Sequence, residues 1–204
     1  MQANELFTQP NTILLDGGMG TMLQAAGLKL GARPEELNIT DPQLIESIHS
    51  RYAAAGSRII NANTFGASAH KLAGSEYTLE EIIAAGIANC KRACAPYGAL
   101  TALDVGPLGE LLEPSGTLAF EDAVSEYARI VRAGAAAGAD LIFFETFTDL
   151  YELKAALLAA KENSTLPILA SMSFEAGGRT FTGCTVESFG VTARGLGANA
   201  VGIN

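Results

Sequence analysis

Six short apolar segments of this chain each end in polar residues or glycines. The sets at their ends are Asp16-Gly17-Gly18, Asn61-Ala62-Asn63-Thr64, Asp104-Val105-Gly106-Pro107, Glu145-Thr146, Ser171-Met172-Ser173 and Asn204. A polar group that leaves an apolar segment needs a hydrogen-bond partner from the protein or from a ligand. For one residue, a neighbouring loop is the simplest partner. Because all six segments end in this way, we interpret the set as a shared site.

The chemical character of this set suits a small zwitterion. A carboxylate such as Glu145 would hold an ammonium group, and the backbone N–H groups of Gly17 and Gly18 would hold a carboxylate. No lysine lies at the end of an apolar segment, which argues against a Schiff-base aldolase. His49 and His70 fall in helical segments. The residues alone therefore offer no obvious nucleophile, general base or metal site.

The three cysteines have two different settings. Cys90 and Cys94 share a helical stripe with Ile83 and Ile87, which favours inward packing over a metal or redox pair. Cys184 follows an apolar segment without a nearby histidine or second cysteine, and we interpret it as a loop residue.

Composition limits the class of protein. The chain has 204 residues, of which 49% are hydrophobic, and this is enough for one domain with a substantial core. The net charge of −9 argues against binding to nucleic acid or anionic membranes. No apolar segment approaches the ~20 residues that span a bilayer. The N-terminal sequence also lacks a signal-peptide pattern, so we expect a cytoplasmic protein.

Strands and helices are predicted to alternate along the chain. Strands are expected at 13–16, 59–63, 100–105, 141–145, 168–173 and 200–204, and their nearly continuous apolar character is typical of parallel strands buried on both faces. The sequences TDPQ (40–43) and TLEE (78–81) fit capping boxes that start helices, and the first helix should end before Gly56. Further helices should carry Phe120 and Leu150, and another should begin near Val186.

This alternation predicts an α/β fold with a parallel sheet, either open or closed. Each strand–helix unit averages about 34 residues, close to the ~31 of a (β/α)8 TIM barrel. DGGMGT (16–21) lacks the spacing of a dinucleotide-binding loop, which also favours the barrel. We therefore predict one barrel domain over residues 1–204 that holds about six of the eight units.

Six sequence stretches carry a family resemblance. In order along the chain they are LLDGGMGTMLQ (14–24), PEELNIT (34–40), NANTFGAS (61–68), DVGPLGELL (104–112), FFETFTDLYELKAAL (143–157) and SMSFEAGGRTFTG (171–183). Together they resemble the homocysteine S-methyltransferases, most closely the N-terminal homocysteine-binding module of cobalamin-dependent methionine synthases. The resemblance implies a barrel that transfers a methyl group to the sulfur of homocysteine to form methionine.

The resemblance also implies how the sulfur is activated. A free thiol is mostly protonated at neutral pH, and family members bind it as thiolate on zinc held by three cysteines. One of these cysteines follows the sixth strand in a Gly-x-Asn-Cys motif, and a Cys-Cys pair follows later. Gly202-Ile203-Asn204 ends one residue before that position. We therefore expect the zinc ligands beyond Asn204, with methylcobalamin as methyl carrier and folate- and cobalamin-binding domains downstream as partners.

Individual residues take roles by the same resemblance. Glu145 should hold the substrate amino group, and Asp104 should be structural. The expected substrate-binding residues are Asp16, Gly17, Gly18, Asn63, Glu145 and Asn204. No catalytic residue and no metal ligand is expected within the chain.

Three alternatives stay open. The methyl donor could be S-methylmethionine, S-adenosylmethionine or betaine. The chain could instead be a non-catalytic folded fragment, which would associate to cover its open sheet edges. An unrelated barrel enzyme that acts on amino acids is the third possibility.

Overall fold

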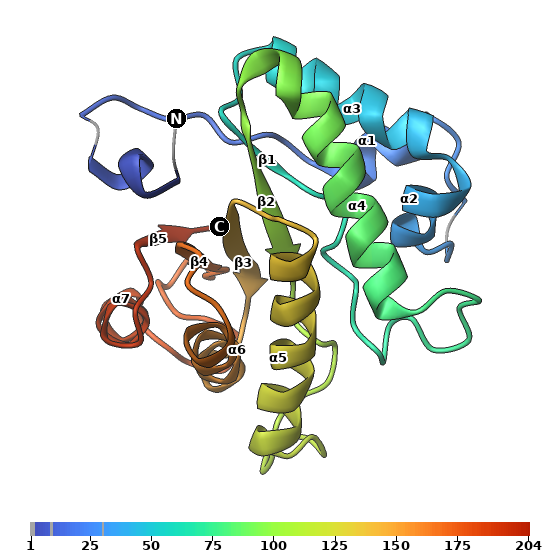
Figure 1. Cartoon of the computed structure of the whole chain (residues 1–204). Helices are drawn as coiled ribbons and strands as arrows, with labels where there is room; N and C mark the ends of the chain where they lie inside the picture. The colour runs from blue at the N-terminus through green and yellow to red at the C-terminus, as the bar shows by residue number, and fades with distance from the viewer. Residues whose placement is uncertain (1–2, 9, 30) are drawn as a thin grey trace.

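The computed structural model describes residues 3–8, 10–29 and 31–204. Its centre is a parallel sheet whose strand order follows the chain (Figure 1). The strands are β1 (Ile59–Asn61), β2 (Leu100–Val105), β3 (Leu141–Phe147), β4 (Ile168–Met172) and β5 (Ala200–Ile203). Every neighbouring pair is parallel, and at least one helix lies between each two strands in sequence. This is the strand order of a (β/α)8 barrel and confirms the predicted α/β class.

The predicted strand at 13–16 is reduced to a single bridge, between Leu15 and Ile59. Side chains replace part of the expected ladder there. The Asp16 carboxylate accepts the Asn61 N–H at 3.0 Å, and the Ser57 hydroxyl donates to the Leu15 carbonyl at 3.1 Å. The segment still runs parallel to β1 and places Asp16 beside its end.

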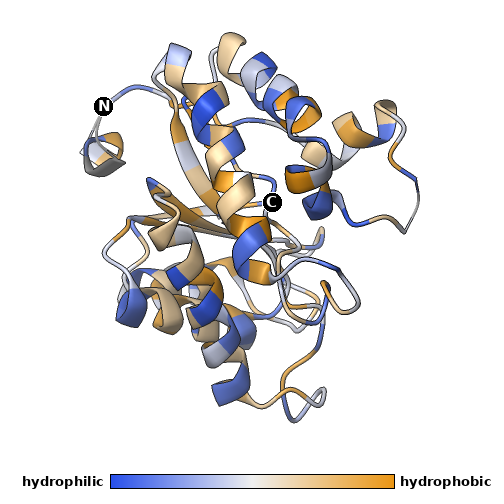
Figure 2. Ribbon diagram, turned by 45° about the vertical axis from the view of Figure 1, so that its right-hand side comes forward, coloured by the Kyte–Doolittle hydropathy of each residue, from blue (hydrophilic) through white to orange (hydrophobic). Residues whose placement is uncertain are grey.

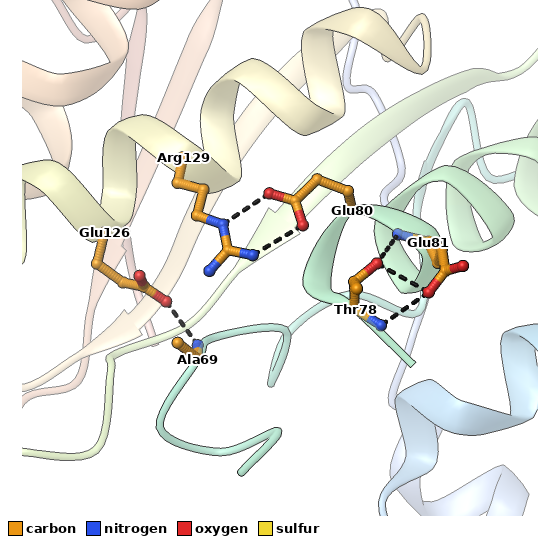
Figure 3. A network of polar contacts seen from close by, with 6 residues as sticks. All are labelled: Ala69, Thr78, Glu80, Glu81, Glu126 and Arg129. Carbon is orange, nitrogen blue, oxygen red and sulfur yellow. Dashed lines mark hydrogen bonds and ion pairs between the residues drawn. The ribbon is translucent and has the colours of Figure 1, made fainter. Parts of the chain in front are cut away.

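Helices cover one side of this sheet, and their starts follow local sequence. The long ones are α3 (Pro42–Ala54), α4 (Leu79–Cys94), α5 (Phe120–Ala136), α6 (Leu150–Asn163) and α7 (Val186–Gly195); the shorter elements are η1 (Ala3–Thr8), α1 (Met19–Ala25), η2 (Pro34–Glu36), α2 (Leu37–Thr40) and η3 (Ala95–Tyr97). The capping box at Thr78 is confirmed: its side chain accepts the Glu81 N–H, and Glu81 reaches back to the Thr78 N–H (Figure 3).

The capping box predicted at 40–43 is wrong. Asp41 caps α3 instead, because its carboxylate accepts the Leu44 N–H at 3.2 Å. Thr40 belongs to α2, and its hydroxyl donates to the Glu36 carbonyl. Pro42 holds the first helical position and disfavours helical geometry in the residue before it, so the cap falls on Asp41. The predicted end of α3 is confirmed, since Gly56 follows it with φ 108°.

The sheet separates two apolar clusters. The larger lies between the sheet and the helices and includes Ile60, Leu103, Phe144 and Tyr127. The smaller lies on the other face of the sheet, where Leu6 of η1 packs among residues from the starts of the strands. In Figure 2 several of the helices show one hydrophobic and one hydrophilic side, as packing on one face requires.

The predicted packing role of Cys90 and Cys94 is confirmed. Both lie buried in the larger cluster, with their sulfurs 3.7 Å apart. Cys184 lies half-buried in the loop before α7, as predicted. Among the described residues, no helix has the length and apolar character that crossing a membrane requires.

Candidate functional site

The pleat of the strands builds the floor of a site from alternate residues. On β2, Leu100 and Ala102 belong to the inner apolar cluster, and Asp104 lies two residues further on the same face. On β3, Leu141 and Phe143 belong to that cluster. The inner face of the sheet therefore changes from apolar to acidic toward the carboxyl ends of its strands, where barrel enzymes place their sites.

A bulge in β3 marks the position of Glu145. Phe144 pairs with Ala170 and Phe147 with Met172, so three steps on β3 oppose two on β4. Thr146 occupies φ 64°, which is uncommon for a β-branched residue. The extra residue lets both Phe144 and Phe147 pack in the outer cluster while Glu145 faces inward. Bulges of this kind often re-aim side chains next to sites.

A cavity of about 390 Å³ opens at these strand ends. It brings together five of the six predicted substrate-binding residues, Asp16, Gly17, Gly18, Asn63 and Glu145. The other described residues that line it are Met19, Gly20, Pro34, Glu35, Asn61, Ala62, Phe65 and Asp104. This volume and mixed lining are within the range of small-molecule sites.

Asp16 enters the cavity from the segment beside β1. Its carboxylate is held by the Asn61 N–H at 3.0 Å. Burial, together with the charge of Glu145, nevertheless raises the pKa of Asp16 to about 7. The next residue must be small, because a Cβ at Gly17 would lie 2.9 Å from the Tyr52 hydroxyl. Asp16 is therefore a carboxyl group that titrates near neutral pH and lies beside an exposed glycine backbone.

Asp104 and Glu145 add two further acids from β2 and β3. Burial is the main cause that raises the pKa of each carboxyl group, and for Asp104 the charges of Glu145 and Asp16 add to it. Asp104, which was expected to be structural, is 7% exposed and lines the cavity. Its period-two spacing from Leu100 and Ala102 was the sequence signal that it faces inward with them.

Glu35 is a fourth acid, and it comes from η2 rather than from a strand end. It is buried, and its carboxylate accepts the Gly66 N–H at 2.8 Å. A Cβ at Gly66 would come within 2.5 Å of that carboxylate. No periodic pattern marked Glu35 in advance, because a loop contact rather than a strand places it in the cavity.

The side chain of Asn63 is fixed by a neighbouring amide. It donates to the Pro34 carbonyl at 2.8 Å and to the Asn38 side-chain oxygen at 3.0 Å, while Asn38 donates to the Asn63 carbonyl at 2.8 Å. Both N–H donors of Asn63 are thereby engaged, so only its side-chain oxygen is left to face a ligand.

Asn204 does not line this cavity. Its amide donates to the hydroxyls of Thr146 at 2.7 Å and of Ser173 at 3.4 Å. It therefore joins β5 to the ends of β3 and β4.

The donor set of the cavity does not fit a thiolate-bound zinc ion. Its described lining has carboxylates and amides but no cysteine, whereas zinc prefers sulfur and nitrogen ligands. Across residues 3–8, 10–29 and 31–204, no group of three or more His, Cys, Asp or Glu side chains is arranged to hold a metal ion.

Fold and cavity together define a barrel-type α/β domain with an acidic cavity at the carboxyl ends of its strands. The homocysteine S-methyltransferase family model matches residues 13–204. The chain belongs to the homocysteine S-methyltransferase family.

Two relatives give the context. The chain is 30% identical over 209 residues to the methionine synthase of Mycobacterium tuberculosis, covering 93% of this chain but only 17% of that protein. The metallated form of the homocysteine methyltransferase MmuM from Escherichia coli superposes with a TM-score of 0.86 at 22% identity, covering 98% of this chain and 76% of that one. The second likeness shows the fold, and it confirms the predicted barrel-type architecture.

Proposed function

We propose that this chain is the homocysteine-binding part of a methyltransferase that forms methionine. The observation that carries the proposal is the convergence of Asp16, Glu145 and the backbone of Gly17 and Gly18 in one cavity. An amino acid presents one cation and one anion, and this cavity offers groups for both. Family membership supports homocysteine as the amino acid.

Each part of the substrate has a partner in this arrangement. The carboxylates of Glu145 and Asp16 accept hydrogen bonds from the ammonium group, and the N–H groups of Gly17 and Gly18 hold the carboxylate. Phe65 is apolar and gives the side chain of the substrate a surface to pack on.

The methyl carrier in this proposal is methylcobalamin. The likeness to a methionine synthase supports it. Because the chain spans 17% of that relative, the proposal includes folate- and cobalamin-binding domains elsewhere in the full protein. Zinc would be held by cysteines after Asn204, since Cys90 and Cys94 are buried in the core. The described residues of the cavity do not themselves fit zinc, because they offer carboxylates and amides but no cysteine.

Titration calorimetry of the purified chain with L-homocysteine tests the binding step. We expect one site per chain, lost in Glu145→Gln and kept in Glu162→Gln, whose side chain is exposed on α6. Absence of binding to the wild-type chain would refute the proposal.

Zinc content and donor use test the remaining parts. Metal analysis should find zinc in a protein extended past Asn204 and not in this chain; stoichiometric zinc in this chain would contradict the proposed location. The extended protein should use methylcobalamin in preference to S-methylmethionine, S-adenosylmethionine or betaine.

A further inference from the structure

The carboxyl group of Asp104 is buried in the cavity with one oxygen unsatisfied. Its Oδ1 has no hydrogen-bond partner among the described residues, and the residue is 7% exposed. The backbone around it is held firmly: the Thr64 hydroxyl donates to the Asp104 carbonyl at 2.8 Å, and the Asp104 N–H donates back to that hydroxyl at 3.2 Å. A buried oxygen of this kind normally has a partner.

Another buried acid in the same chain shows what a structural role looks like. Glu152, on α6, is 3% exposed. Its Oε1 accepts both the Tyr127 hydroxyl at 2.8 Å and the Leu108 N–H at 2.7 Å. The fold thus supplies donors to a carboxylate that it uses internally. Among the described residues, no group donates a hydrogen bond to Asp104 Oδ1, and this points to a donor on a ligand.

The surroundings of Asp104 call for a ligand rich in positive N–H donors. Glu145, Asp16 and Glu35 line the same cavity, and all three are close enough for their charges to affect Asp104. No Lys, Arg or His is among the described residues of the lining. Lys71 affects Asp104 from outside the lining, where its ammonium group donates to the Pro107 carbonyl at 2.6 Å.

A primary ammonium group has three N–H donors. The Glu35 carboxylate already accepts the Gly66 N–H, and the other three carboxyl groups of the cavity come from three separate segments. We propose that Asp104 is a third acceptor for the ammonium group of the substrate, beside Asp16 and Glu145, and makes the site selective for a primary amine. The inference rests on the proposed homocysteine site and deepens it. It replaces the structural role expected for Asp104 from sequence.

Charge balance gives this arrangement a measurable consequence. Burial raises the pKa values of the three carboxyl groups, and the charge of Glu145 adds to this effect for Asp16 and Asp104. Because the pKa of Asp16 is about 7, part of the cluster is protonated near neutral pH. An ammonium group favours their ionised forms, and binding should therefore release protons to the buffer.

The test measures, by calorimetry, the affinity of three ligands for the wild-type chain and for the variants Asp104→Asn, Glu145→Gln and Glu162→Gln. The ligands are L-homocysteine, N-methyl-homocysteine and 4-sulfanylbutanoic acid, which lacks the amino group. Asp104→Asn should weaken homocysteine binding by roughly 10- to 100-fold and change the amine-free acid by less than about twofold. Equal losses for both ligands would show a structural role and overturn the inference. Glu162→Gln serves as the matched control.

Two outcomes of the experiment distinguish a failure of the role of Asp104 from a failure of the proposed function. If the wild-type chain binds no homocysteine, the proposed function fails. If Glu145→Gln loses binding and Asp104→Asn retains it for every ligand, only the inference fails. Should Asp104→Asn not fold, the wild-type chain decides: it should prefer homocysteine to N-methyl-homocysteine by at least about tenfold, and equal affinities would overturn the inference.

Discussion

Acids on the outer helices and acids in the cavity are held in opposite ways. Glu80 of α4 accepts two hydrogen bonds from Arg129 of α5, at 2.6 and 2.8 Å, and Glu81 accepts the Thr78 N–H at 2.9 Å (Figure 3). These donors hold the pKa of Glu80 and of Glu81 below the usual value. Both of these surface acids therefore have a partner within the protein.

In the cavity, burial dominates and the pKa values rise instead. The charge of Glu145 acts on Asp16 and on Asp104, and Oδ1 of Asp104 has no hydrogen-bond partner among the described residues. The surface acids stabilise the fold slightly, whereas burial of the ionised cavity acids lowers its stability. A cationic ligand in the cavity would give these acids the positively charged partner that Arg129 gives Glu80.

The largest expected effect is on binding. Glu145→Ala should raise the dissociation constant for homocysteine by at least about 100-fold, because it removes one of the buried ammonium group's charged acceptors. Glu80→Ala, the surface counterpart, should leave the constant unchanged. Calorimetry of both variants measures this, and a change under about threefold in Glu145→Ala would reduce it to a strand-end hydrogen-bond acceptor.

The second effect is on stability and carries a definite sign. The pKa of Asp16 is about 7 in the folded chain against an ordinary value of 3.8, so the folded state binds the proton more tightly. Stability is therefore lost as pH rises from about 4 to about 7. Asp16→Asn should raise the free energy of unfolding by about 4 kcal/mol at about pH 8 and by much less near pH 4. Urea unfolding at both pH values measures it; a destabilised variant at pH 8 would contradict the account.

A buried histidine provides the converse case. His49 is fully buried, neither ring nitrogen has a partner among the described residues, and burial lowers its pKa to about 4 from 6.5. The unfolded state binds the proton more tightly, so stability is lost as pH falls from about 6.5 toward 4. His49→Leu should remove about 2 kcal/mol of the loss between about pH 7 and pH 5. Urea unfolding of both proteins across that pH range measures the difference. If the free energy of unfolding of His49→Leu falls toward low pH as steeply as that of the wild-type chain, the account of His49 is wrong.

The smallest effect belongs to the surface pair. Glu80→Gln should lower the free energy of unfolding by less than about 1 kcal/mol, because both side chains are substantially exposed. The difference should shrink further in high salt. A salt-independent loss above about 2 kcal/mol in urea titrations, roughly twice the usual upper value for an exposed ion pair, would contradict the contrast between the two regions.

Much of the fold could be predicted because its signals are local. Apolar segments located the five regular strands, and Thr78 with Glu81 located the start of α4. The segment at 13–16 failed as a strand because side chains of Ser57 and Asp16 take part of its pairing. The apolar pattern of the segment does not indicate that side-chain hydrogen bonds will take the place of backbone pairing.

The site was predictable where it follows strands and not where loops complete it. Asp16 and Glu145 were identified, and both line the cavity. Asp104, expected to be structural, also lines the cavity, because the pleat turns it inward with Leu100 and Ala102. Glu35 arrives through a contact with Gly66, 31 residues away, and Asn204 is directed to other strand ends. Contacts of this kind depend on tertiary structure rather than on periodicity.

The extra residue in β3 also restricts how this sequence can diverge. Thr146 meets two opposing demands, since φ 64° favours glycine while the hydroxyl accepts the Asn204 amide. Glycine would relax the backbone and abandon the contact. Asparagine tolerates this backbone region and retains a side-chain acceptor. Among sequences that keep the bulge, we therefore expect position 146 to drift among threonine, asparagine and glycine, with glycine only where residue 204 no longer needs an acceptor there.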